Sequence, residues 1–252
     1  MIESPNHDAR RDDIRFVVLH YTGMESGEAA RERLCDPEAK VSAHYLVWED
    51  GRVEALVPED RRAWHAGVGE WRSVTDLNSA SIGIEIVNGG HDWPDADGKL
   101  PPFPVAQIKS VVRLLKTMLA RYDLTPDAVI GHSDLAPTRK QDPGEHFPWR
   151  HLAEQGVSIW PDSAEADATI LAGPDDGGRE VSLAQRALAD IGYAQEVTGR
   201  LDDSTRLTLA AFQRRFRPER VDGLLDVQTL ARLSALMGAP ARDLHTRQPD
   251  ST

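Results

Sequence analysis

The sequence carries, between residues 129 and 144, the stretch Val129-Ile-Gly-His132-Ser-Asp-Leu-Ala-Pro137-Thr-Arg-Lys140-Gln-Asp142-Pro-Gly144. Its two β-branched residues indicate a short buried strand, and the proline and glycine residues that follow indicate a loop. The loop brings an imidazole (His132), an ammonium group (Lys140) and a carboxylate (Asp142) into eleven residues. Such a loop can direct His132 and Asp142 to one metal ion. The stretch therefore predicts a strand that ends at a candidate metal site.

The segments before this stretch alternate between strand and helix patterns. β-Branched apolar runs predict buried strands, and a turn around Gly51 separates two of them as in a hairpin. Apolar residues three or four positions apart predict helices. The predicted elements are strands at 14–19, 43–48, 53–57, 81–87 and 129–130 and helices at 27–34 and 105–122. Short strands that alternate with helices indicate an α/β domain, which we expect to span residues 1–160.

Length and composition limit the class of protein. The 252 residues leave room for two domains, and the net charge of −12 disfavours a nucleic-acid-binding protein, which normally has a basic surface. Cys35 is the single cysteine, so no internal disulfide can form. No run reaches the roughly 18 apolar residues of a membrane span, and residues 1–13 lack the apolar core of a secretion signal. We therefore expect a cytoplasmic location, or a periplasmic one if an export signal has been removed.

The composition changes after Trp160. Residues 161–179 are rich in Asp, Ala, Gly and Pro without periodicity, which is typical of a linker. Beyond them the pattern Gly-x-Leu-Asp-x-x-Thr occurs twice, at 199–205 and 223–229. In each copy the Gly suits a turn, and the Asp is suited to cap the helix that follows. We predict a small three-helix domain over 180–240, with helices near 182–191, 203–215 and 226–237, and a tail at 241–252.

Five polar residues of the first domain suit hydrolytic zinc chemistry. A catalytic zinc ion takes three protein ligands and leaves one position for water, and His20, His132 and Asp142 form a suitable set. Bound zinc lowers the pKa of water toward ~7 and polarises a carbonyl group. Glu85, in a buried strand where desolvation raises a carboxyl pKa, suits the general base. Lys140 suits the stabilisation of an oxyanion.

Plainer interpretations of the same residues stay open at this point. A single His after a strand is usually structural, and the ten-residue spacing of His132 and Asp142 does not by itself prove a metal site. Glu85 could be an ion-paired core residue and Lys140 a solvated loop charge. An unrelated zinc peptidase is disfavoured because the chain has no His-Glu-x-x-His motif.

Residues 14–149 resemble the zinc-dependent N-acetylmuramoyl-L-alanine amidases of the type-2 (AmpD-like) family. This family shares a fold, a mixed central β-sheet flanked by helices, with the peptidoglycan recognition proteins. The resemblance rests on the opening stretch and on four earlier motifs: Val17-Val-Leu-His20-Tyr-Thr, Val41-Ser-Ala-His44-Tyr-Leu-Val, Arg62-Ala-Trp64-His65-Ala-Gly and Asn78-Ser-Ala-Ser-Ile-Gly-Ile-Glu85.

The resemblance implies a role for each matching residue. It makes His20, His132 and Asp142 the zinc ligands, Glu85 the general base and Lys140 the lysine that stabilises the transition state. Trp64, His65 and Asn78 fall where the family builds its substrate groove, and His44 is not a family zinc ligand. The chain departs from the expected pattern at Tyr21, where an Asn or His would be expected after the first ligand. These eight assigned roles are expectations.

The C-terminal helices resemble the peptidoglycan-binding module that is often fused to cell-wall hydrolases. Together the two resemblances imply hydrolysis of the amide bond between N-acetylmuramic acid, or its 1,6-anhydro form, and L-alanine of the stem peptide, in muropeptide recycling. The alternatives are a non-catalytic peptidoglycan receptor and an exported wall-degrading amidase, and the C-terminal module could be purely structural. The expected partners are muropeptides or peptidoglycan fragments. We expect no nucleic-acid, membrane or protein partner.

Overall fold

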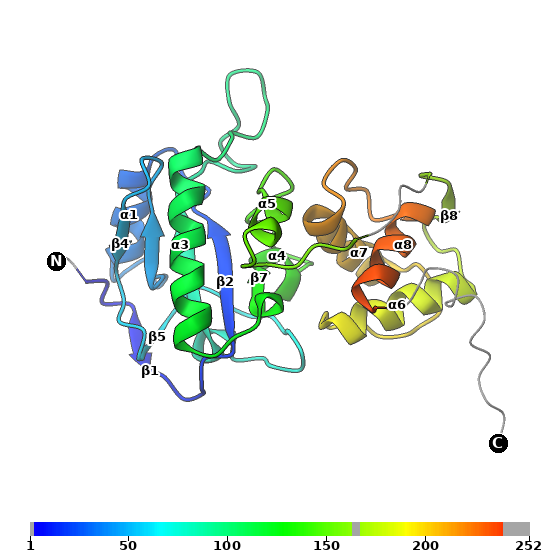
Figure 1. Ribbon diagram of the computed structural model, residues 1–252, viewed down its shortest axis with the longest axis horizontal. Coiled ribbons are helices and arrows are strands. Elements are labelled where there is room, and N and C mark those ends of the chain that lie inside the picture. Colours follow the sequence, from blue (N-terminus) through cyan, green and yellow to red (C-terminus); the bar gives the residue numbers. More distant parts are fainter. Residues whose placement is uncertain (1–2, 163–166, 239–252) are drawn as a thin grey trace. The chain divides into compact units, whose positions relative to one another are not determined.

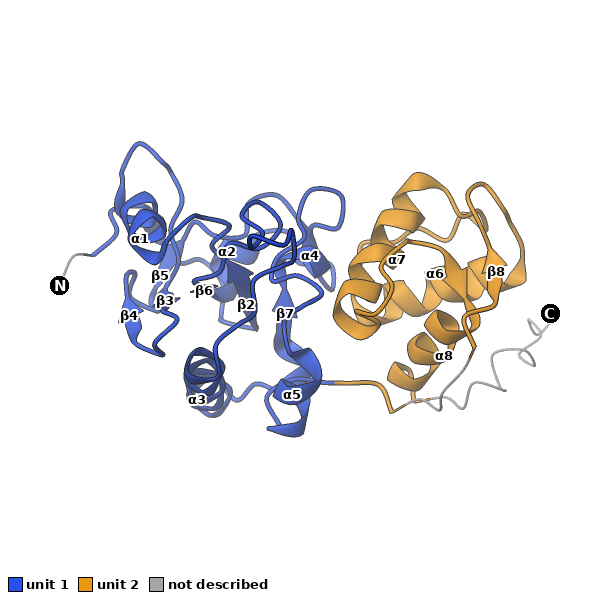
Figure 2. Cartoon of the chain, turned by 90° about the horizontal axis from the view of Figure 1, so that it is seen from above, with its two compact units in different colours: residues 1–159 blue, residues 160–252 orange. Residues whose placement is uncertain are grey.

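The structure, a computed structural model, describes residues 3–162 and 167–238. The chain divides into two compact units, residues 1–159 and residues 160–252, which are coloured separately in Figure 2. The tail expected at 241–252 lies outside the described residues.

The first unit is built on a five-stranded mixed sheet. Its strand order is β4 (Val53–Ala55), β3 (Tyr45–Val47), β6 (Ser81–Ile86), β2 (Phe16–Tyr21) and β7 (Val129–Gly131). All neighbouring pairs are parallel except β3 and β4, which form the expected antiparallel hairpin. A separate antiparallel pair joins β1 (His7–Ala9) to β5 (Arg61–Ala63). The α/β fold with a mixed central sheet is therefore confirmed.

Helices cover both faces of this sheet. The long α3 (Val105–Arg121) lies along one face and buries the stripe predicted from its apolar spacing, including Ile108, Val111 and Leu115 (Figure 1). The short α2 (Leu77–Ala80) and α4 (His132–Leu135) lie on the other side (Figure 2). The remaining helices of this unit are α1 (Gly27–Cys35), α2 (Leu77–Ala80), η1 (Pro126–Ala128), α4 (His132–Leu135) and α5 (Trp149–Glu154).

The strand register brings distant polar residues together. In the parallel pair of β2 and β6, His20 lies opposite Glu85, and in the pair of β2 and β7, Leu19 lies opposite Gly131. His132 follows Gly131 directly, as the first residue of α4. Because the carboxyl ends of parallel strands meet at one edge of a sheet, His20, Glu85 and His132 all reach the same edge.

The second unit contains the three expected helices, α6 (Arg179–Ile191), α7 (Asp203–Phe216) and α8 (Val227–Leu236). Leu188, Leu209, Phe212, Phe216 and Leu233 form its buried core. The expectation that residues 161–179 lack regular structure is wrong at β8 (Ile170–Ala172), which pairs with β9 (Leu225–Asp226). A strand of three residues is too short to leave a periodic signal in sequence.

The two copies of the internal repeat in the second unit share one pattern of hydrogen bonds. Asp202 caps α7 and Asp226 caps α8, each by accepting from the backbone N–H of the Thr three residues later, as the pattern predicts. A buried glutamine then serves each copy. Gln185 Oε1 accepts from Gly199 N–H at 2.8 Å and its Nε2 donates to Thr205 Oγ1 at 2.9 Å. Gln213 makes the matching bonds to Gly223 N–H at 2.8 Å and to Thr229 Oγ1 at 3.2 Å.

Candidate active site

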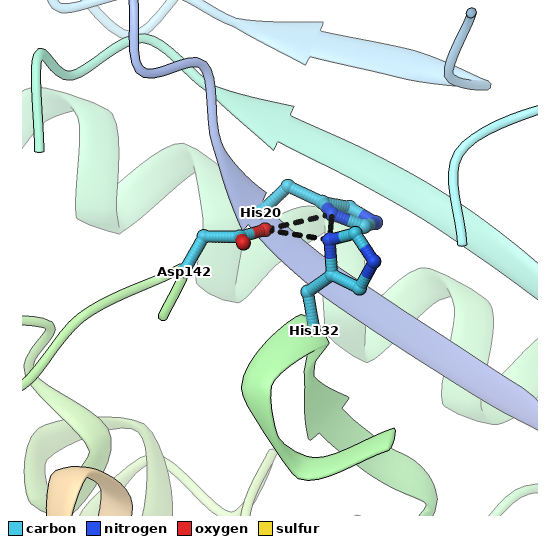
Figure 3. Close-up of side chains that lie close together, drawn as sticks. All are labelled: His20, His132 and Asp142. Atoms are coloured by element: carbon cyan, nitrogen blue, oxygen red, sulfur yellow. Dashed lines mark hydrogen bonds and ion pairs between the residues drawn. The ribbon is translucent and has the colours of Figure 1, made fainter. Parts of the chain in front are cut away.

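Three side chains converge at the carboxyl edge of the sheet. His20 Nδ1, His132 Nδ1 and Asp142 Oδ2 lie 2.9 Å from one another on all three sides of a triangle. Figure 3 shows the side chains pointing toward one another from β2, from α4 and from the loop after α4. All three residues are buried, and they form a group whose ligand atoms could hold one metal ion.

Backbone contacts hold His132 and Asp142 next to each other. The carbonyl oxygen of Asp142 accepts from Ser133 N–H at 2.9 Å, which ties the loop to the first turn of α4. The carboxylate of Asp134 accepts from Gly131 N–H at 2.8 Å and so fixes the entry into that turn. The peptide bond between Asp142 and Pro143 is cis.

The far sides of both imidazoles also have partners. His132 Nε2 lies 2.9 Å from the carbonyl oxygen of Ala66, so this nitrogen carries the proton and Nδ1 presents a lone pair. His20 Nε2 lies 3.0 Å from His65 Nδ1. Since metal-binding histidines characteristically donate their other N–H to an acceptor, this arrangement fits a pair of Nδ1 ligands.

The electrostatics favour a bound cation at this point. Burial lowers the pKa of His20 to about 4, with a further contribution from His132, so the imidazole is neutral at pH 7. Burial raises the pKa of Asp142, but its interactions with His132 and His20 outweigh burial and hold the pKa well below its usual range. A neutral His20 imidazole and an ionised Asp142 carboxylate are in the protonation states that metal ligands require.

Glu85 stands beside this group on β6. Burial raises the pKa of its carboxyl well above the usual value, the negative charge of Asp142 raises it further, and Lys140 acts in the opposite direction. Its Oε2 is enclosed and has no hydrogen-bond partner among the described residues. A carboxyl group with a raised pKa and a free oxygen at a site is suited both to accept and to donate a proton.

A pocket of about 330 Å³ opens over the three converging side chains. Its lining includes Glu85, Lys140, Trp64 and Arg139 as well as the three possible ligands. Arg139 is held by the backbone, because its guanidinium donates to the carbonyl oxygens of Ala66 at 2.6 Å and Val68 at 3.0 Å. The structure thus brings together the five residues expected to do the chemistry.

The three residues expected in the substrate groove lie in different surroundings. Trp64 is partly exposed and lines the pocket. His65 also reaches the pocket, but only 8% of its surface is exposed and its ring lies behind His20. Asn78 is buried in α2, and its Oδ1 accepts from the backbone N–H groups of His65 at 2.9 Å and Ala66 at 2.7 Å. Their roles in substrate binding stay predictions.

His44 lies in the interior, as expected of a histidine that is not a ligand. Its Nδ1 accepts from Gly83 N–H at 2.9 Å, and its Nε2 lies 3.1 Å from the carbonyl oxygen of Arg61. Burial lowers its pKa to about 4. Its hydrogen bonds hold two strand segments together.

Sequence reasoning missed two groups near the site. One is a pocket wall in which the Tyr21 hydroxyl lies 3.0 Å from His91 Nδ1, while His91 Nε2 lies 3.2 Å from Glu145. No spacing signal joins these residues, which come from three separate segments. The other is Ser81, whose Oγ lies 3.3 Å from His65 Nε2. Ser81 lies four residues before Glu85 on β6, and this spacing was a usable signal because every second residue of a strand lies on the same face.

No helix of residues 3–162 and 167–238 is both long and apolar enough to cross a membrane.

Two family models match the chain. The model described as N-acetylmuramoyl-L-alanine amidase matches residues 10–145, which is more than half of the chain. The model described as a putative peptidoglycan binding domain matches residues 177–233, in the second unit. The first match includes every residue of the converging group and of the pocket lining named above.

Curated relatives agree with the first model. The N-acetylmuramoyl-L-alanine amidase AmiD of Escherichia coli is 36% identical over 241 residues, covering 91% of this chain and 84% of the relative. The 1,6-anhydro-N-acetylmuramyl-L-alanine amidase AmpD of Enterobacter cloacae is 35% identical over 167 residues, covering 59% of this chain and 84% of the relative.

Solved structures give the same result. A complex of Escherichia coli AmiD with the substrate anhydro-N-acetylmuramic acid-L-Ala-D-γ-Glu-L-Lys is 36% identical, with a TM-score of 0.77 and a coverage of 92% of each chain. Pseudomonas aeruginosa AmpDh3 in complex with an anhydromuramic pentapeptide is 37% identical, with a TM-score of 0.72, covering 88% of this chain and 90% of that one.

Proposed function

The chain belongs to the N-acetylmuramoyl-L-alanine amidase family, and on this premise we propose how its site performs the hydrolysis. The activity is cleavage of the amide bond between N-acetylmuramic acid and L-alanine of the peptidoglycan stem peptide. The observation that carries the proposal is the buried triangle of His20 Nδ1, His132 Nδ1 and Asp142 Oδ2 beside the unpartnered oxygen of Glu85.

The group that the site would hold is Zn²⁺, with His20, His132 and Asp142 as its ligands. Two imidazoles and a carboxylate are a donor set that zinc uses in catalytic sites. When bound, zinc supplies a Lewis acid that polarises the scissile carbonyl group and makes water acidic enough to act as a nucleophile near neutral pH. The three ligand side chains are already buried, and the pKa shifts of His20 and Asp142 favour a neutral imidazole and an ionised carboxylate.

Glu85 is the general base and Lys140 the oxyanion-stabilising cation. The raised pKa of the Glu85 carboxyl suits it to take a proton from the attacking water and to return one to the leaving amine of L-alanine. Lys140 lines the same pocket, and its ammonium group is suited to stabilise the negative charge that the carbonyl oxygen gains. A non-catalytic receptor would have no use for this complete set.

The substrate is a soluble muropeptide, including the 1,6-anhydro form, as in the recycling of wall fragments. The AmiD and AmpDh3 complexes hold anhydromuramic peptides, which supports this choice. Trp64 offers an apolar ring at the pocket for the sugar or the peptide, with His65 and Asn78 behind it. The second unit binds the glycan of larger peptidoglycan fragments. The compartment proposed for the enzyme is the cytoplasm, which cell fractionation tests.

One experiment tests the proposal directly. The zinc-loaded chain is incubated with anhydromuropeptide and with intact sacculi, and the products are identified by mass. We expect free stem peptide, its loss on chelation and in Asp142→Ala, and its recovery when zinc is added back to the chelated wild type. His151→Ala is the matched control, because His151 is an exposed histidine nine residues from Asp142. Stem peptide released at the wild-type rate by Asp142→Ala would contradict the proposal.

A further inference from the structure

In both candidate zinc-binding histidines the ring nitrogen that faces away from the site, Nε2, contacts the dipeptide His65-Ala66. His20 Nε2 lies 3.0 Å from the His65 ring, and His132 Nε2 lies 2.9 Å from the carbonyl oxygen of Ala66. We propose that His65 and Ala66 form a single anchor that sets the tautomer and the orientation of both ligands, with His65 as a positioning residue rather than a substrate-binding one. This inference rests on the zinc site of the proposed function.

The donor and the acceptor of each hydrogen bond from Ser81 through His65 to His20 follow from the last acceptor of the series, the carbonyl oxygen of Leu77. The Ser81 hydroxyl donates to the carbonyl oxygen of Leu77, which can only accept. Ser81 Oγ therefore accepts from His65 Nε2–H at 3.3 Å. A neutral imidazole with its proton on Nε2 has a bare Nδ1, so His65 Nδ1 accepts from His20 Nε2–H. His20 is left with a bare Nδ1 facing Asp142.

His132 reaches the same state by a shorter route. The carbonyl oxygen of Ala66 can only accept, so His132 Nε2 donates and Nδ1 is bare. Two lone pairs and a carboxylate oxygen then face one point from three sides, which is a ligand geometry for a cation. Hydrogen bonds of this kind fix the ring orientation of metal-binding histidines and raise their basicity.

The dipeptide itself is held from the side away from the zinc site. Asn78 Oδ1 accepts from both of its backbone N–H groups, at 2.9 and 2.7 Å, so one buried amide fixes both halves of the anchor. Space for the His65 ring depends on Gly83, because a Cβ atom there would lie 2.3 Å from His65 Cγ. Ser81, Gly83 and Glu85 alternate along β6 and face the same side. β6, the strand that carries Glu85, therefore also positions the anchor formed by His65 and Ala66.

The test measures the affinity of the chain for zinc, by competition with a chromophoric chelator. His65→Phe keeps a ring but removes the acceptor, and we expect affinity to fall by about 10- to 100-fold, the usual cost of losing such a partner. His65→Asn places an acceptor where Nδ1 was and should restore most of the affinity. Asn78→Leu should lower affinity as well, whereas Asn78→Asp, which keeps Oδ1, should not.

The matched control is His44→Phe. His44 is as buried as His65, but its hydrogen bonds go to Gly83, Arg61 and Arg10 and none reaches a candidate ligand, so its loss should lower stability with a much smaller change in zinc affinity than His65→Phe. Circular dichroism of each variant reports the fold. Equal affinities of wild type and His65→Phe, or equal losses in His65→Phe and His65→Asn, would overturn the anchor.

A measurement on the wild type needs no variant to fold. In zinc-loaded chain labelled with ¹⁵N-histidine, NMR should show His65 protonated on Nε2 and bare on Nδ1, and His20 protonated on Nε2. A proton on His65 Nδ1 would overturn the anchor. If the wild type binds no zinc, the proposed zinc site fails together with the anchor, whereas wild-type binding with unchanged variants refutes only the anchor.

Discussion

Glu85 is the residue on which catalysis depends most in this proposal, because it is close to the ligands without being one of them. Its Oε2 has no hydrogen-bond partner among the described residues, and its carboxyl pKa is raised by burial and by Asp142. An enclosed carboxyl group without a partner is costly unless a substrate or a water uses it. The same residue in an ordinary core would be paired, which separates the catalytic interpretation from the structural one.

Glu85→Gln should therefore separate chemistry from zinc binding. The amide keeps the size of the side chain but cannot accept a proton from water, so kcat should fall by about 10²- to 10⁴-fold, the usual contribution of general acid–base catalysis. Zinc affinity should stay near that of the wild type. Steady-state kinetics with anhydromuropeptide and a zinc titration of the same preparation check the two halves. A variant that keeps kcat within tenfold would remove Glu85 from the mechanism.

At this scale the sequence indicated residue types better than residue surroundings. His20 and His132 were predicted as ligands because each follows a buried run, and Asp142 because it lies in the same loop as His132; the structure places the three side chains within hydrogen-bond distance of one another. His65 was expected in the substrate groove; it lines the pocket, and its two ring nitrogens contact His20 and Ser81. Which of two faces a loop histidine uses depends on packing against β6, and packing partners leave no local pattern in the sequence.

His44 makes the stability of the chain depend on pH. Burial, with a smaller contribution from the positive charge of Arg10, lowers its pKa to about 4, while Glu59 opposes the shift. The unfolded chain takes up a proton near pH 6.5, the folded one does so only near pH 4, and stability therefore falls as the pH drops through this window. Two and a half pKa units correspond to on the order of 3 kcal/mol.

The measurement compares wild type with His44→Asn in denaturant, without zinc, at pH 6.5 and pH 4.5. Asn Oδ1 can still accept from Gly83 N–H but has no proton to gain. The free energy of unfolding of the wild type should drop by about 2–3 kcal/mol more than that of the variant over this interval. Histidines present in both chains cancel in the difference. Parallel pH profiles would show that His44 is not the group responsible.

At the scale of elements, β6 and the repeat of the second unit differ in how far their structure could be predicted from local sequence patterns. β6 was predicted as a buried strand. On one of its faces Ser81 contacts the His65 ring, Gly83 leaves room for that ring, and Glu85 is the proposed general base. In the repeat, the caps Asp202 and Asp226 were readable because capping is local. The glutamines were not, since each acts on a glycine ten or fourteen residues further along the chain.

Gln213→Ala tests the element-scale role of these glutamines. Its removal leaves the N–H groups of Asp222 and Gly223 and the carbonyl oxygen of Leu224 without their partner in a buried turn. Unmaking such bonds costs about 1–3 kcal/mol for a buried group, so the free energy of unfolding should fall by at least this amount. Gln228→Ala, a glutamine in α8 that is only half-buried, is the matched control and should stay within about 0.5 kcal/mol. Equal losses in the free energy of unfolding of Gln213→Ala and Gln228→Ala would contradict a specific role of the buried glutamine.

At the scale of the whole molecule, we propose that hydrolysis belongs to the first unit and binding of large peptidoglycan fragments to the second. Every residue that lines the pocket lies between residues 20 and 142, inside the first unit. The second unit has its own buried core around Phe212 and Phe216 and matches the peptidoglycan-binding model. Composition indicated this division through the change after Trp160, because linkers and domains differ in apolar content over many residues. The single strand β8 inside that segment was too short for composition to detect.

A chain of residues 1–162 should therefore keep its activity on small substrates and lose it on large ones. Hydrolysis of soluble anhydromuropeptide needs only the pocket, so kcat/KM should stay within a few-fold of the full chain. Binding to sacculi in a sedimentation assay should fall by about tenfold or more, because the loss of a tethered second binding site removes the gain in effective concentration that it provides. A matched full-length Asp142→Ala chain should show the reverse, with sacculi bound and no stem peptide released. If the short chain sediments with sacculi as well as the full one, the second unit is a structural appendage, and its resemblance to a glycan-binding module is one of fold alone.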